Sequence, residues 1–95
     1  MGEGRHVDAV NARKLLREIL ASGTLTYSGH AKIEMAKDRL TTQDAVNVLR
    51  AGMVEPSEFE RGSWRHRVKT GTMCVVVVLV SVGEAVVVTA CRIRR

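Results

Sequence analysis

The most constraining feature of this 95-residue chain is the run TMCVVVVLVSV at residues 72–82, which is almost entirely apolar or β-branched and carries no charge. A run that is apolar on both alternating faces is typical of a strand at the centre of a sheet, covered above and below. It is too short to cross a bilayer as a helix, which takes about 20 residues. A second apolar run at residues 85–93 follows after Gly83 and Glu84, so the two runs are predicted to form an antiparallel hairpin.

The first helix is predicted at residues 7–22, where apolar and charged side chains separate onto two sides of a helical wheel. Gly23 ends it. Its core side is formed by Ala12, Leu15, Leu16, Ile19 and Leu20, and its charged side by Arg13, Lys14, Arg17 and Glu18. The charged side is interpreted as solvated surface, with phosphate contact as the alternative.

Two shorter helices are predicted from their capping residues. Ser28 is a suitable N-cap for a helix over residues 29–39. Thr41 caps the next helix, with Asp44 placed for a capping box and Gly52 as its C-terminal stop. The side chains expected to face the core are Ile33, Ala36, Leu40, Ala45, Val46, Leu49 and Met53.

The sequence period changes to two after the helices. Residues 53–61 are predicted to be a weak strand or a loop, with Pro56 at a sheet edge because it lacks an N–H. Residues 63–70 alternate clearly, with Trp64 on one face and Arg65 on the other. The predicted fold is therefore one α+β domain over residues 1–95, in which N-terminal helices pack on a three- to four-stranded antiparallel sheet.

The charge distribution points to a polyanion as one partner. The formal net charge is +5 and the sequence pI is about 9.9. The scarcity of aromatic residues argues against a platform on which bases stack. A line of cations on one strand face is predicted to bind RNA phosphates, with further arginines before it and on the last strand. These residues are Arg65, Arg67 and Lys69, joined by Arg61, Arg92 and Arg94.

Two histidines could make such a surface catalytic. Cleavage of RNA without a metal needs a proton acceptor, a proton donor and cations around the phosphorus. His30 and His66 are the candidates for proton transfer, with Arg65 and Arg92 stabilising the phosphate. The alternatives are that His30 belongs to a surface ion-pair line with Glu34 and that His66, which shares a face with Trp64, is a core residue.

No metal site or cofactor is predicted. The sequence contains neither GxGxxG nor GxxxxGK[ST], and Cys74 and Cys91 form no metal-binding motif. With a turn at residues 83–84, Cys91 would lie opposite Val76. Both cysteines are interpreted as small buried side chains in a reducing compartment. No apolar signal segment follows Met1, so a cytoplasmic location without membrane association is expected.

Several short motifs resemble the domain-of-unknown-function 4258 family of small bacterial proteins. They are His30, the pair Arg39-Leu40, the helix Asp44-Ala45-Val46 with Val48-Leu49, and the closing strand Val88-Thr89-Ala90-Cys91-Arg92. An aromatic residue is usual in that family where Cys91 stands.

The order of elements from residue 19 to residue 92 also resembles MqsR-type mRNA interferase toxins of the RelE-like fold. The resemblance implies an endoribonuclease paired with an antitoxin. In those toxins the proposed active residues are a Lys, a Gln, a Tyr and a Lys. The corresponding positions here hold Arg61, Arg65, Cys74 and Arg92, so the phenol of the Tyr is missing.

The functional prediction is a metal-independent endoribonuclease toxin, with RNA and a cognate antitoxin as partners. The alternative is a non-catalytic protein-binding module, either an immunity or antitoxin-type partner or an inactive toxin relative. A homodimer is a third prediction, because the strand at residues 72–82 needs a cover on both faces.

Overall fold

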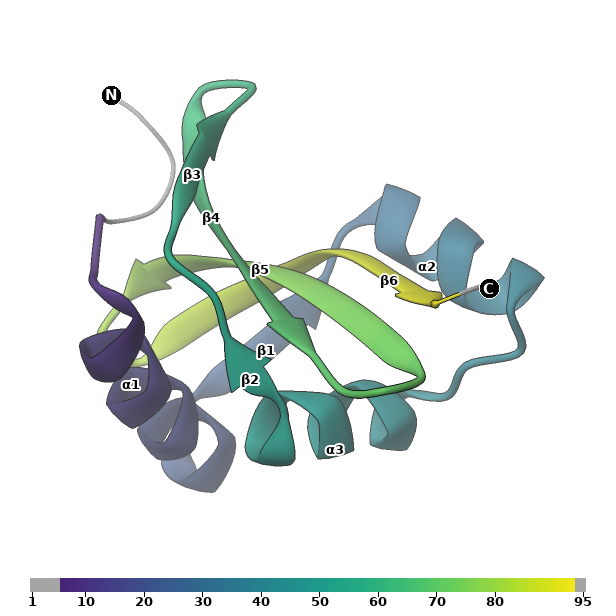
Figure 1. The fold of residues 1–95 in the computed structure, drawn as a ribbon, viewed down its shortest axis with the longest axis horizontal. Coiled ribbons are helices and arrows are strands. Elements are labelled where there is room, and N and C mark those ends of the chain that lie inside the picture. Colours follow the sequence, from purple (N-terminus) through teal and green to yellow (C-terminus); the bar gives the residue numbers. More distant parts are fainter. Residues whose placement is uncertain (1–5, 94–95) are drawn as a thin grey trace.

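The computed structural model describes residues 6–93, so the phosphate contact predicted for Arg94 lies outside the described residues. The fold is α+β, as predicted, with helices packed on a six-stranded mixed sheet (Figure 1). No helix within residues 6–93 is long and apolar enough to cross a membrane. The elements are α1 (Ala9–Ser22), β1 (Thr24–Tyr27), α2 (Gly29–Lys37), α3 (Thr42–Ala51), β2 (Met53–Val54), β3 (Glu58–Glu60), β4 (Ser63–Lys69), β5 (Met73–Ser81) and β6 (Glu84–Arg92).

The antiparallel β5–β6 hairpin is confirmed and forms the middle of the sheet, whose strand order is β1-β6-β5-β4-β2. Every residue from Val75 to Leu79 is buried, as a central strand requires. The predicted register is wrong by two residues, because Ser81 pairs with Glu84 and the turn therefore lies at residues 82–83. From Val77 to Leu79 the shift is three residues, because bulges interrupt the ladder. Cys91 therefore keeps its predicted face, whereas Ala85 and Val87 face the core and not the predicted opposite side.

The prediction of a purely antiparallel sheet with three or four strands is wrong. β1 pairs in parallel with the first half of β6, and β3 adds to β4 beyond the main sheet. β1 is only four residues long and alternates between exposed and half-buried positions, so its pattern is too short to be recognised. Its place depends on a close contact, because a Cβ on Gly23 would lie 2.5 Å from the carbonyl oxygen of Gly83. Glycine is needed where two backbones approach this closely.

α1 and α3 cover one face of the sheet and enclose the core with it (Figure 1). α1 begins after the N-cap Asp8, close to the predicted start, and its predicted core side is confirmed by the burial of Ala12, Leu16 and Ile19. From the sheet, Val75, Val77 and Leu79 belong to the same core cluster, whereas Val76 and Val78 do not. The alternate residues of β5 therefore face away from α1 and α3.

The predicted caps of α2 and α3 are confirmed, but part of their predicted core side is wrong. Ser28 accepts a hydrogen bond from the N–H of Ala31, and Thr41 and Asp44 form a complete capping box. The Thr41 N–H holds the pKa of the Asp44 carboxyl below its ordinary value. On α2, Ala31 and Met35 are buried, while Ile33 and Ala36 are exposed. The reason is that α2 packs on β6 with the side that carries Ala31 and Met35.

The end of α3 accounts for the error at Met53. The helix stops at Ala51, and Met53 is the first residue of β2, where it is 74% exposed. Its predicted place in the core is taken by Val48. Gly52 is required at this junction for space, because a Cβ there would lie 2.7 Å from the Val48 carbonyl oxygen and 2.8 Å from that of Lys69. Its φ of −75° shows that the predicted left-handed C-terminal stop is not used.

Candidate functional site

The sheet face turned away from α1 and α3 carries a groove of about 330 Å³. Its sheet residues are Cys74 and Val76 of β5 and Thr89 and Cys91 of β6. The β3–β4 hairpin rises on one side of this face, and α2 lies beyond the other side (Figure 1). These two elements contribute the polar lining side chains, which are His30, Glu60, Arg61, Arg65 and Arg67. Four of the predicted site residues are thus brought together.

A second hollow of about 200 Å³ also includes Arg61 and Arg65 in its lining. It is lined otherwise by Ser63 and the valines Val78, Val80, Val86 and Val88. Because the two arginines line both hollows, the groove has a polar part near His30 and an apolar part further along the sheet. The second face of the central strand is therefore covered partly by the hairpin rather than by a helical layer.

The predicted line of cations on β4 is present, but its charges are largely paired. His66 and Val68 are buried on one face, which places Arg65, Arg67 and Lys69 on the other. Arg67 is bound to Glu58 and lies 3.6 Å from Glu60, and Lys69 lies 3.1 Å from Glu55. The hydrogen bond to Glu58 is the main reason that the pKa of Arg67 is raised. Two of the three cations are thus compensated by carboxylates of neighbouring segments.

The basic groups of the groove that form no ion pair within residues 6–93 are His30, Arg61 and Arg65. Arg65 donates a hydrogen bond from Nε to Ser63 Oγ at 3.3 Å. His30 is exposed and pairs with no carboxylate of the described residues, and the predicted surface ion pair on α2 is made instead by Glu34 and Lys37 at 3.7 Å. The three side chains are therefore available to an anionic ligand.

Arg61 is held at the tip of the β3–β4 hairpin by an unfavourable backbone conformation. Its φ is +50° and that of Gly62 is +83°, the pattern of a type I′ turn between the paired residues Glu60 and Ser63. Asn, Asp or Gly is usual at the first position of such a turn. An arginine there costs about 1 kcal/mol of backbone strain. The hairpin thus presents a cation at a position where turn chemistry does not favour one.

His66 lies on the opposite side of the sheet from the groove. Its side chain is fully buried, and its Nε2 is 2.8 Å from the carbonyl oxygen of Val7. The neighbouring Trp64 packs against His6 and Phe59, with ring centroids 4.4 and 5.2 Å apart. The structure thus favours the core interpretation of His66, and the proton-transfer role predicted for it has no access to the groove.

Arg92 connects β6 to the segment after α2. Its backbone N–H donates to Asp38 Oδ2 at 2.8 Å, and its Nε donates to the Asp38 carbonyl oxygen at 3.0 Å. It follows Cys91 on the strand, so by alternation it points away from the groove that Cys91 lines. The structure does not bring Arg92 together with His30.

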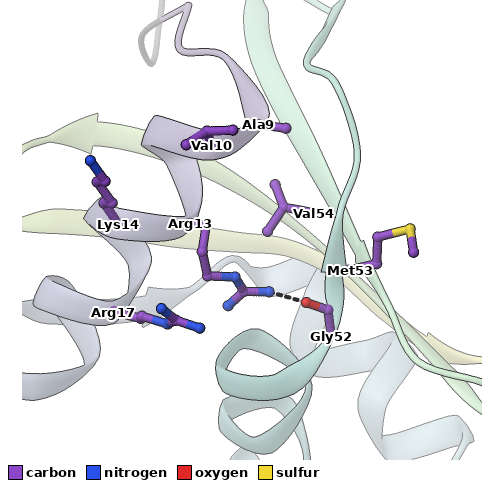
Figure 2. A pocket seen from close by; sticks show the side chains of 8 residues that line it. All are labelled: Ala9, Val10, Arg13, Lys14, Arg17, Gly52, Met53 and Val54. Carbon is purple, nitrogen blue, oxygen red and sulfur yellow. Dashed lines mark hydrogen bonds between the residues drawn. The ribbon is translucent and has the colours of Figure 1, made fainter.

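Arg13, which the sequence analysis placed on the solvated side of the first helix with phosphate contact as the alternative, has a structural role. Figure 2 shows the Arg13 guanidinium reaching from α1 to the carbonyl oxygen of Gly52, in a hollow of about 410 Å³ between α1 and β2. Arg13 also donates to the carbonyls of Leu49 at 2.5 Å and Arg50 at 3.2 Å. Burial lowers the pKa of Arg13, and the nearby charge of Arg17 adds to this. Arg13 therefore caps the C-terminal end of α3, where the carbonyls have no N–H within the helix to accept from.

We expect Arg13→Ala to lower the free energy of unfolding by about 2–3 kcal/mol, because hydrogen bonds to a charged group contribute about 1.5–3 kcal/mol and the carbonyls would lose them. Urea unfolding followed by circular dichroism measures this. Arg17→Ala is the matched control, since Arg17 lines the same hollow without a hydrogen bond to α3. Equal losses in the two variants would show that the cap is unimportant.

The chain matches no protein-family model, no curated protein and no solved structure. Within residues 6–93, no three His, Cys, Asp or Glu side chains are grouped so that they could hold a metal ion.

Proposed function

We propose that the groove binds the phosphodiester backbone of RNA and that His30 makes the protein a metal-independent endoribonuclease. The observation that carries the proposal is the convergence of His30, Arg61 and Arg65 on one open groove, without ion pairs among the described residues. A guanidinium group is planar and permanently charged, so it can donate two parallel hydrogen bonds to two oxygens of one phosphate. Imidazole exchanges a proton near neutral pH, as transesterification of RNA requires.

The proposed reaction uses the ribose itself as the nucleophile. His30 accepts the proton of the 2′-OH, the 2′ oxygen bonds to phosphorus, and the bond from phosphorus to the 5′ oxygen breaks. The departing oxygen takes its proton from water, because the groove holds no second histidine among the described residues. Arg61 and Arg65 stabilise the charge on the pentacoordinate phosphorus. The products are a 2′,3′-cyclic phosphate and a 5′-hydroxyl end, and His30 returns its proton to solvent.

We further propose that the protein is a RelE/MqsR-like toxin that acts in the cytoplasm and is neutralised by a protein antitoxin. The order of elements supports the similarity to these toxins: helices are followed by a strand that carries Trp64 and then by a C-terminal apolar hairpin. Arg61 and Arg65, which occupy two of the proposed active positions of those toxins, both line the groove and support it further.

A second candidate is the non-catalytic protein-binding module. It is favoured by the ion pairs of Arg67 and Lys69, which reduce the charge available to RNA. The exposed Val10 and Met53 beside the hollow of Figure 2 also favour it, since apolar side chains around a basic hollow suit a protein ligand. If this candidate is correct, RNA binds weakly and substitution of the groove residues does not change its affinity.

We expect the double variant Arg61→Asn, Arg65→Gln to bind single-stranded RNA at least about tenfold more weakly, with a salt slope reduced by about 1.4, because each cation contacting a phosphate of a single strand contributes about 0.7 to that slope. Asn tolerates the left-handed backbone at position 61, so the hairpin is preserved. Fluorescence anisotropy with a labelled oligonucleotide over a series of salt concentrations measures both quantities.

The matched control is Lys14→Gln, Arg17→Gln on α1, which removes the same charge from a different surface. Its affinity should change much less than that of the groove variant. If the two double variants lose affinity equally, binding follows net charge and the groove is not the RNA site.

A further inference from the structure

Cys74 and Cys91 are direct partners across the β5–β6 hairpin. One hydrogen bond of the same ladder, from the N–H of Ile93 to the carbonyl oxygen of Thr72, identifies the pair of residues 72 and 93 as hydrogen-bonded. Hydrogen-bonded and non-hydrogen-bonded pairs alternate along an antiparallel ladder, so the two cysteines also form a hydrogen-bonded pair. Their Cα atoms are then about 5.5 Å apart, within the range that a disulfide spans.

Both thiols are also accessible from solvent. Each cysteine is half-buried rather than buried, and both line the groove beside Val76 and Thr89. The interpretation of the cysteines as buried core side chains is therefore wrong. The Cys91 thiol lies close enough to affect Cys74, since its proximity adds to the burial that raises the pKa of the Cys74 thiol.

We propose that Cys74 and Cys91 are an oxidation site, at which a peroxide or a small-molecule disulfide joins them in an intramolecular disulfide. With hydrogen peroxide, one thiolate takes an oxygen atom to form a sulfenic acid and releases hydroxide. The second thiol then displaces hydroxide from that sulfur. In total two thiols lose two protons and two electrons, one S–S bond forms, and the peroxide is reduced to two molecules of water.

The geometry further assigns a reversible rather than a permanent bond. Facing Cβ atoms of a strand pair lie about 4.5–5.5 Å apart, whereas a disulfide holds them about 3.8 Å apart. Closure must therefore draw β5 and β6 together locally, and strained disulfides are reduced more readily than relaxed ones. The raised pKa of Cys74 slows its reaction as a thiolate, so oxidation is expected to be faster at alkaline pH.

The test treats the reduced protein with hydrogen peroxide, unfolds it, and labels remaining thiols with N-ethylmaleimide before intact-mass spectrometry. Oxidised wild type is expected to remain a monomer in which neither cysteine reacts with N-ethylmaleimide. Treatment with reduced glutathione should make both cysteines reactive again. Cys74→Ser and Cys91→Ser are the controls. With no neighbouring thiol to trap the sulfenic acid, the remaining cysteine should gain oxygen atoms and form no intramolecular bond.

Three outcomes would overturn the inference. They are loss of one wild-type thiol without the other, loss through disulfide-linked dimers, and oxidation of each cysteine separately to sulfinic acid. Because this readout needs no RNA, a failure here leaves the proposed nuclease activity standing. Conversely, absence of RNA binding would leave the disulfide standing.

Discussion

His30→Gln is expected to reduce RNA cleavage by roughly 10²- to 10⁴-fold, the usual contribution of a general acid–base group. His30 is the one histidine that lines the groove among the described residues, so no neighbour can take over proton transfer. RNA affinity should fall less than about threefold, because the phosphate contacts of Arg61 and Arg65 remain. Cleavage of an end-labelled single-stranded RNA in the presence of a metal chelator measures the rate, and anisotropy measures the affinity.

Arg92→Ala is the control for this prediction. The resemblance to MqsR-type toxins implies a catalytic role for Arg92, whereas the structure ties its side chain to Asp38 outside the groove. Its cleavage rate should therefore stay within a few-fold of wild type, provided the variant is folded. Induced expression in a bacterium gives a second readout, with growth arrest and mRNA loss relieved by His30→Gln. Wild-type protein that is soluble and folded but cleaves no RNA would contradict the nuclease proposal and favour the protein-binding module.

Leu49→Ala is expected to lower the free energy of unfolding by about 2–5 kcal/mol, the range for removing a buried leucine side chain. The Leu49 side chain is 0% exposed and belongs to the core cluster that includes residues of α1 and of the sheet. For a domain of this size, each kcal/mol corresponds to about 4–8 °C in the melting temperature. Thermal and urea unfolding by circular dichroism measure the loss.

Met53→Ala is the matched control, because Leu49 and Met53 lie four residues apart and both were predicted to face the core. At 74% exposure Met53 has little packing to lose, so its variant should stay within about 0.5 kcal/mol of wild type. A loss at Met53 as large as that at Leu49 would mean that Met53 is covered in solution, which is the result expected if a second copy of the chain packs there.

The features predicted correctly are those encoded by neighbouring residues. The apolar run within β5 and the short connection after it were sufficient to place the central hairpin. The capping box of Thr41 and Asp44 involves residues three apart, and its hydrogen bonds form as expected. The alternation of β4 placed Arg65 and Arg67 on one face, because side chains of a strand alternate wherever the strand lies.

The errors arise where an element ends or where elements meet. Met53 continued the helical period but falls after the end of α3, and Ile33 lies on a face of α2 that meets no partner. β1 had too few residues to show a period. Each of these depends on how one segment packs on another, which periodicity alone does not specify.

The sequence by itself therefore determined the α+β class, the central hairpin and the polar face of β4, because local periodicity decides which side of an element is buried. Only the tertiary structure decided which basic side chains are free of ion pairs among the described residues and can therefore bind a phosphate. Pairing of β3 with β4 brings Glu58 to Arg67, while α2 beside β6 brings His30 to the groove of Arg61 and Arg65. Ion pairs and thiol pairs depend on distances between segments remote in the chain, and those distances exist only after the segments have packed.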